Sequence, residues 1–138
     1  MRQMSGSFGA GAVIYTADID RLVVFYVTVL GFREAERKPD YVVLETKTFQ
    51  LVLLRAEGVL APSADLGAGP SPRRSGATIK PVFLVSSIAV ARAAAPDVGG
   101  RINAPRHEWR FEAHMVCDGL DPDGNVIQLR EARNTGPA

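Results

Sequence analysis

The chain has 138 residues, 46% of them apolar, and its 16 basic and 15 acidic residues give a formal net charge of +1. This balance indicates a soluble globular protein of one domain or two small modules, with no electrostatic footprint for nucleic acid. Residues 79–95, the longest apolar stretch, are interrupted by Lys80, Pro81 and Arg92 and do not form a membrane span, and the first ten residues lack the apolar core of a secretory signal. The single cysteine, Cys117, favours a cytoplasmic location and a small buried thiol.

The first half of the chain predicts a strand that leads into an amphipathic helix. Residues 12–16 are β-prone, Asp18 and Asp20 offer N-cap oxygens, and apolar side chains then recur at helical spacing until Gly31. Three further strands are expected at residues 34–37, 41–45 and 49–54.

The second half repeats this order at a fixed offset. Ile19 corresponds to Ile88, an offset of 88 − 19 = 69 residues. Ser86 and Ser87 replace the capping aspartates, and Gly100 is expected to end the second helix as Gly31 ends the first. The expected elements are a strand at 82–85, a helix at 89–95 and strands at 101–103, 110–116 and 126–130.

This repeat predicts an α+β fold with two βαβββ modules that form a cup-shaped mixed sheet. Module 1 is expected at residues 8–57 and module 2 at residues 77–132, with a Pro/Gly-rich linker at 58–76 and a flexible tail at 133–138. A module of about 55 residues is marginal alone and its open sheet edges need cover, so we expect a homodimer. The alternative is two unrelated α+β pieces.

Two segments carry a resemblance to a known family. Residues 20–32 read DRLVVFYVTVLGF, and residues 121–131 read DPDGNVIQLRE, in which Pro122 and Gly124 predict a turn into the last strand. With the repeat, these segments resemble the vicinal oxygen chelate superfamily, which includes glyoxalase I, bleomycin-resistance proteins and ring-cleaving dioxygenases. The resemblance covers roughly residues 10–132 and is specific to the superfamily but not to a reaction.

The resemblance also implies where a metal would be bound, on the first and last strands of each module. The corresponding residues are Gly11 and Val52 in module 1, and Lys80 and Gln128 in module 2. Glycine and valine carry no donor atom and an ammonium group has no lone pair, which leaves the Gln128 amide oxygen. Because a catalytic metal needs three or more N, O or S ligands, we expect neither metal nor cofactor.

Residues 110–116 are interpreted as one strand with a polar and an apolar face. The polar face consists of Arg110, Glu112 and His114, and the apolar face of Phe111, Ala113 and Met115. The apolar face should cover the helix. The simplest interpretation of the polar face is solvent exposure or an ion pair of Glu112 with Lys80 or Arg130.

Enzyme chemistry is the competing hypothesis for the same residues. A lyase, isomerase or dioxygenase would need a metal at Glu112, His114 and Gln128, or a metal-free acid–base pair of His114 with Tyr15 or Tyr41. A third hypothesis is a structural or regulatory dimer with a filled cup.

The cup is predicted to have mostly apolar walls with a few polar groups. Tyr15 and Tyr41 alternate with Ile14 and Val42, which should pack under the helix, so the tyrosines face the cup. Trp109 offers a flat apolar face for a planar ligand. The sequence favours equally a position in the hydrophobic core and a position at the rim of the cup. The expected ligand-binding residues are Tyr15, Tyr41, Lys80, Val82, Leu84, Trp109, His114 and Gln128, with Val13 and Val43 as further walls.

This composition is typical of a small-molecule pocket. We therefore expect a glyoxalase/bleomycin-resistance-like protein that sequesters an aromatic or planar compound without a metal. Its expected partners are a small-molecule ligand and a second copy of the chain, with no nucleic acid and no membrane.

Overall fold

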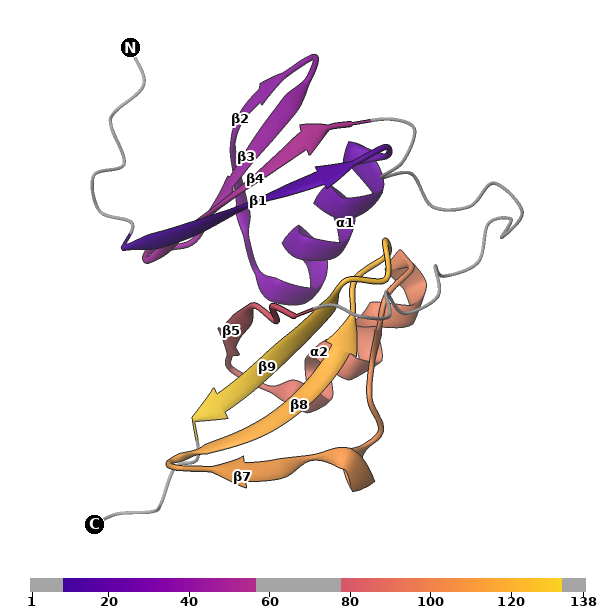
Figure 1. Cartoon of the computed structure of the whole chain (residues 1–138). Helices are drawn as coiled ribbons and strands as arrows, with labels where there is room; N and C mark the ends of the chain where they lie inside the picture. Colours follow the sequence, from indigo (N-terminus) through magenta and orange to yellow (C-terminus); the bar gives the residue numbers. More distant parts are fainter. Residues whose placement is uncertain (1–8, 57–77, 133–138) are drawn as a thin grey trace. The chain divides into compact units, whose positions relative to one another are not determined.

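The structure, a computed structural model, describes residues 9–56 and 78–132, and the chain divides into two compact units, Met1–Ser63 and Ala64–Ala138 (Figure 1). The linker predicted at 58–76 and the tail predicted at 133–138 lie outside the described residues. Within each unit an α-helix covers one face of that unit's sheet. Among the described residues, no helix combines the length and apolar character needed to cross a membrane.

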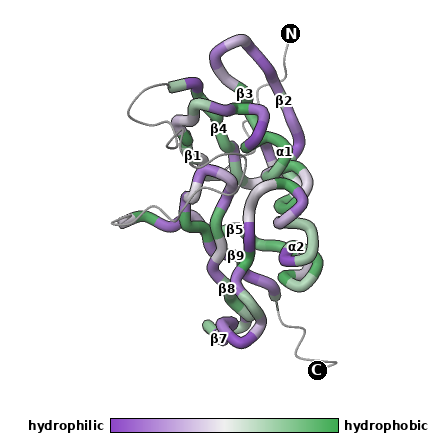
Figure 2. Tube along the Cα trace, turned by 90° about the vertical axis from the view of Figure 1, so that its right-hand side faces the viewer, coloured by the Kyte–Doolittle hydropathy of each residue, from purple (hydrophilic) through white to green (hydrophobic). Residues whose placement is uncertain are grey.

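Unit 1 has the predicted order of one strand, one helix and three strands. Its elements are β1 (Ala10–Thr16), α1 (Ile19–Leu30), β2 (Arg33–Lys38), β3 (Tyr41–Glu45) and β4 (Phe49–Arg55). The sheet order is β1-β4-β3-β2, in which β1 and β4 are parallel and the other neighbours are antiparallel. Figure 2 shows the contrast between the hydrophilic edge strand β2 and the more hydrophobic inner strand β4.

The two ends of α1 follow from local chemistry. The Asp18 carboxylate accepts a hydrogen bond from the Arg21 backbone N–H at 3.1 Å, so Asp18 rather than Asp20 is the N-cap residue. Gly31 ends the helix with φ at 74°, a left-handed conformation that glycine adopts most readily. The helix buries an apolar face against β3 and β4, and this core consists of Leu22, Phe25, Tyr26, Val29, Val42, Leu44, Leu51 and Leu53.

Unit 2 repeats the architecture. Its elements are β5 (Val82–Val85), α2 (Ile88–Ala94), the 3-10 turns η3 (Ala95–Val98) and η4 (Pro105–His107), and the strands β6 (Arg101–Ile102), β7 (Trp109–Phe111), β8 (His114–Leu120) and β9 (Val126–Ala132). The sheet order is β5-β9-β8-β6, and β7 also pairs with β8. Parallel pairing places Val13 beside Val52 in unit 1 and Val82 beside Gln128 in unit 2. The two units are therefore equivalent at the predicted offset, and the mixed α+β class is confirmed.

The strand predicted at residues 110–116 is wrong, because this segment is a hairpin. Phe111 pairs with His114, and Glu112 and Ala113 form the turn between β7 and β8. Glu112 has φ at 54°, which is uncommon for a residue other than glycine, and the sequence offers no usual turn residue here. Residues that flank a two-residue loop lie opposite each other on the same face. Phe111 therefore shares a face with His114, contrary to the predicted polar and apolar faces.

The end of the second helix also differs from the prediction of residues 89–95 followed by Gly100. Ser87 caps α2 as expected, by accepting a hydrogen bond from the Val90 backbone N–H at 3.1 Å. After Ala94 the chain tightens into a 3-10 turn that contains Pro96, which cannot donate a helical hydrogen bond. The left-handed residue is Gly99, with φ at 85°, rather than Gly100.

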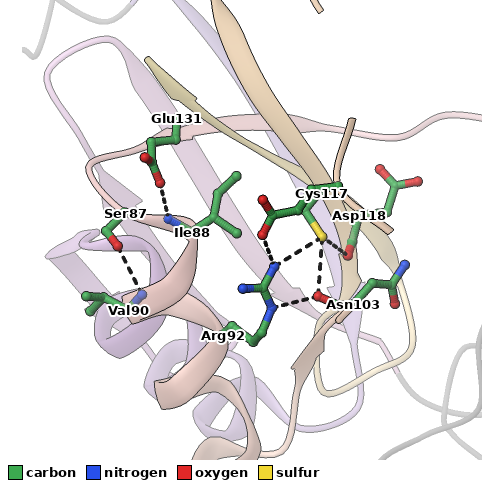
Figure 3. Close-up of polar contacts among 9 residues, drawn as sticks. Ser87, Ile88, Val90, Arg92, Asn103, Cys117, Asp118 and Glu131 are labelled. Atoms are coloured by element: carbon green, nitrogen blue, oxygen red, sulfur yellow. Dashed lines mark hydrogen bonds and ion pairs between the residues drawn. The ribbon is translucent and has the colours of Figure 1, made fainter. Parts of the chain in front are cut away.

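On the helix side of unit 2, Arg92 joins α2 to the loop and sheet around Cys117 (Figure 3). Its Nε donates to the Asn103 carbonyl oxygen at 2.7 Å, and its Nη2 forms an ion pair with Glu108 and lies 3.7 Å from the Cys117 Sγ. Desolvation raises the pKa of the Cys117 thiol, against the opposing hydrogen bond from Arg92. The thiol is buried, as predicted, and contributes to packing.

Candidate functional site

One face of the unit 2 sheet carries all six predicted ligand-binding residues of that unit. Strand register separates this face from the helix side, where Phe83, Ile127 and Leu129 are buried. We call the side opposite α2 the open face and use this name for Lys80, Val82, Leu84, Trp109, Phe111, His114, Asp118, Gln128 and Arg130. Gln128 is buried within this face, as are Val116, Leu120 and Val126, which lie on the same side by register.

The apolar side chains that β5 and β7 contribute to the open face are exposed. Val82 is 42% exposed, Leu84 68%, Trp109 40% and Phe111 45%. These values place Trp109 on the surface of the sheet rather than in the core. Exposed apolar side chains that cluster on one face mark an interaction or ligand-binding surface.

A row of hydrogen bonds crosses the open face. Lys80 Nζ donates to Asp118 Oδ2 at 2.9 Å, and Gln128 Nε2 donates to Asp118 Oδ1 at 3.3 Å. Arg130 Nε donates to Gln128 Oε1 at 2.8 Å. Because its nitrogen and its oxygen both have partners, the Gln128 amide is held in one orientation.

Each cation of this row lies beside an aromatic ring. Lys80 Nζ is 5.8 Å from the centroid of the Trp109 ring, and Arg130 Cζ is 5.0 Å from the centroid of the Phe111 ring. Both distances are within the range of cation–π attraction. The open face thus combines aromatic surface for stacking with positive charge for orientation.

His114 lies on the open face but away from the centre of the polar row. It pairs with Ala132, whereas Asp118 pairs with Gln128, so about 13 Å of strand separates the two positions at about 3.3 Å per residue. The His114 Nδ1 atom is buried and has no hydrogen-bond partner among the described residues.

The predicted site residues of unit 1 lie on the side of its sheet opposite α1. Tyr15 pairs with Leu54 and is 52% exposed. Tyr41 also pairs with Leu54, and its hydroxyl donates to Glu36 Oε2 at 3.1 Å. The two tyrosines therefore share a face, as do Val13 and Val43, which both pair with Val52.

Three residues of the open face were absent from the predicted site. Asp118 was missed because the predicted strand ended at Val116, whereas β8 extends to Leu120. In a strand of this length, the alternation of side chains places Asp118 on the same face as His114. Arg130 shares the parity of Gln128 within a correctly predicted strand, so its position could have been inferred. Phe111 was assigned to the wrong face because the turn at Glu112 carries no sequence signal.

The residues at the metal positions implied by the resemblance do not fit a metal. A β-carbon on Gly11 would lie 2.6 Å from the Gln50 carbonyl oxygen, so this position is closed to a side-chain ligand unless the backbone shifts. Val52 has no donor atom, and the Lys80 ammonium is paired with Asp118. The Gln128 oxygen already accepts a hydrogen bond from Arg130.

The strand register does not bring together Glu112, His114 and Gln128, the residues of the alternative metal site. Glu112 lies in the hairpin turn, and the strand register separates His114 from Gln128 by four residues. Ligands that share a metal must each approach it to about 2.0–2.6 Å. The predicted proximity of Glu112 to Lys80 or Arg130 is not found either: among the ion pairs of residues 9–56 and 78–132, the partner of Lys80 is Asp118 and none involves Arg130. Within these ranges, no group of three or more His, Cys, Asp or Glu side chains is arranged to hold a metal ion.

Several proteins of known structure have a similar fold. Among solved structures, a glyoxalase/bleomycin resistance protein/dioxygenase family enzyme from Burkholderia phytofirmans PsJN has 20% identity, with 88% of this chain and 96% of that chain covered at a TM-score of 0.61. TioX from Micromonospora sp. ML1 has 20% identity, with 92% and 99% covered at 0.63, and a glyoxalase-related enzyme from Fulvimarina pelagi has 17%, with 88% and 86% covered at 0.63. At these identities the structures show a shared fold alone.

The comparison with curated proteins gave no match. The family model for the Glyoxalase/Bleomycin resistance protein/Dioxygenase superfamily matches residues 10–129, which confirms the resemblance found in the sequence. The chain belongs to the glyoxalase/bleomycin resistance protein/dioxygenase superfamily.

Proposed function

We propose that the protein binds a planar or aromatic small molecule on the open face of unit 2 and that no metal takes part. The observation that carries this proposal is the position of the exposed Trp109 and Phe111 rings beside the hydrogen-bonded row of Lys80, Asp118 and Gln128. Apolar walls with a few oriented polar groups are typical of small-molecule sites.

Sequestration accounts for this surface without a catalytic group. The central polar side chains bond to one another, so their role is to orient a ligand that stacks on the apolar part of the face. The donor chemistry of Gly11, Val52 and Lys80 supports a metal-independent mode of binding. The cup between the modules is a prediction from the sequence, and the site proposed here needs the open face of unit 2 alone.

We also propose a cytoplasmic homodimer. Strands β1 and β5 each end their own sheet, and each has one unpaired edge within that sheet as far as the described residues extend. Exposed strand edges are usually covered in stable proteins. Light scattering at micromolar concentration should give twice the mass of the chain, and a monomer mass would contradict this proposal.

A second candidate function is metal-free acid–base catalysis in which His114 takes part. The observation that favours it is the buried Nδ1 of His114, which has no hydrogen-bond partner among the described residues. Turnover of a bound compound that is lost in His114→Ala, with binding retained, would establish this alternative. If the protein is instead a structural or regulatory dimer with a filled cup, none of these compounds should bind.

The proposed function is tested by calorimetric titration of neutral planar aromatic amides, such as 2-naphthamide, in buffer with EDTA. Binding should persist in EDTA and should change the fluorescence of Trp109, the single tryptophan. We expect Phe111→Ala to weaken binding about tenfold, because a lost aromatic contact costs roughly 0.5–1.5 kcal/mol beyond the buried area.

Val90→Ala is the matched control, since Val90 is an equally apolar side chain that is 69% exposed on α2, on the opposite side of the sheet. Its affinity should equal that of the wild type. Absence of binding across the panel, or equal weakening in both variants, would contradict the proposed site.

A further inference from the structure

The two cations of the hydrogen-bonded row on the open face differ in how their charge is balanced. Lys80 forms an ion pair with Asp118 at 2.9 Å, and this carboxylate is also held by Gln128. The charge of Lys80 is therefore neutralised within the face. An anionic ligand would have to compete with Asp118 for this ammonium group.

Arg130 has no such carboxylate. Its Nε donates to the neutral Gln128 amide oxygen, and the ion pairs of residues 9–56 and 78–132 include none with Arg130. Its cross-strand neighbours are Leu84 and Val116, which are uncharged. Within the row of Lys80, Asp118, Gln128 and Arg130 the net charge at neutral pH is therefore +1, and it resides on Arg130. Arg101, which pairs with Leu120 at the far end of β8, is a further exposed cation on the same side of the sheet.

The geometry of Arg130 also leaves its binding edge available. The bond to Gln128 uses Nε, and the Phe111 ring lies beside the guanidinium with its centroid 5.0 Å from Cζ. The terminal Nη1 and Nη2 atoms have no hydrogen-bond partner among the described residues. A guanidinium fork of this kind matches the two oxygens of a carboxylate.

We propose that the ligand of the open face is an aromatic carboxylate, whose carboxylate group binds Arg130 and whose ring packs against Phe111. This inference rests on the proposed function and adds the chemical class of the ligand. Gln128 acts as a positioning residue, because its oxygen fixes Nε and so sets the direction of the fork.

The test is a calorimetric comparison of 2-naphthoate with its neutral counterpart 2-naphthamide on the full chain. We expect the wild type to bind the carboxylate at least about tenfold more tightly than the amide, since hydrogen bonds to charged groups contribute more than neutral ones. Arg130→Gln should reduce the affinity for 2-naphthoate to that for 2-naphthamide. Arg130→Lys should restore part of the difference, because it keeps the charge and loses the fork.

One control separates Arg130 from a general effect of charge. Arg106→Gln removes an exposed arginine in η4 and should have no effect. Thermal unfolding of each variant confirms that the fold is retained.

The outcomes are distinct. If the wild type binds both compounds equally, or if Arg130→Gln leaves the affinity for 2-naphthoate within twofold of wild type, the carboxylate assignment is wrong while the proposed function stands. If neither compound binds, the proposed function is wrong and this inference falls with it.

Discussion

Asp121→Ala should lower the free energy of unfolding by about 3–5 kcal/mol, because it removes a buried charged acceptor from several hydrogen bonds. The Asp121 side chain is 1% exposed. Its Oδ1 accepts from the backbone N–H groups of Asp123 at 3.0 Å and Asn125 at 2.9 Å, and its Oδ2 accepts from Asn125 Nδ2 at 2.9 Å. These bonds hold the turn from which β9 begins, so the loss should also loosen Gln128 and Arg130 on the open face.

Urea denaturation followed by circular dichroism measures this loss. Asp97→Ala serves as the control, because Asp97 is an exposed aspartate in η3 of the same unit. Its substitution should change stability by less than about 0.5 kcal/mol. A loss below 1 kcal/mol for Asp121→Ala would show that the carboxylate is not the centre of the turn.

Phe25→Ala should cost about 3–5 kcal/mol, the usual range for truncation of a fully buried phenylalanine. Phe25 is 0% exposed in the core of unit 1, and its ring meets that of Tyr26 edge to face with centroids 5.1 Å apart. The substitution would leave a cavity between α1 and the sheet of unit 1. Because the surrounding side chains are close-packed, they can fill this cavity only in part.

The adjacent Val24 gives the matched control in the same helix. Val24 is 49% exposed, so Val24→Ala should change the free energy of unfolding by less than about 0.5 kcal/mol in the same urea titration. Equal losses for the two variants would mean that α1 does not pack on the sheet through Phe25.

These two substitutions probe the two segments that carry the family resemblance. In segment 20–32, Phe25 and Tyr26 fill the core and Gly31 ends the helix; in segment 121–131, Asp121 organises a turn. Both roles concern the fold rather than a reaction. This explains why the resemblance identifies the superfamily while leaving the chemistry to other residues.

Much of the fold could be predicted because local signals and the repeat agree. Asp18 and Ser87 start the helices as N-caps, and Gly31 ends the first one with positive φ. Period-two alternation assigned Tyr15 and Tyr41 to the face opposite α1, which the strand register confirms. The same logic brought Lys80, Val82 and Gln128 to one face of unit 2.

The errors arise where tertiary context overrides local preference. Glu112 adopts a left-handed conformation without being glycine or asparagine, so nothing in the sequence marks the hairpin. A missed two-residue turn reverses the face of every earlier residue in the segment, which hid Phe111. Asp118 follows Cys117 in a strand whose extent the sequence left undefined, and its role depends on cross-strand pairing with Gln128.

The most direct test of the account is mapping of 2-naphthoate binding on the full chain by NMR chemical-shift changes in EDTA. We expect the largest changes at the Trp109 indole N–H and at the amides of Val82, Phe111 and Arg130. The amides of Val24 and Val90 should not shift, and no further change should occur when Zn²⁺ or Ni²⁺ replaces EDTA. Changes centred elsewhere, or binding that requires the metal, would contradict a metal-independent ligand site on the open face.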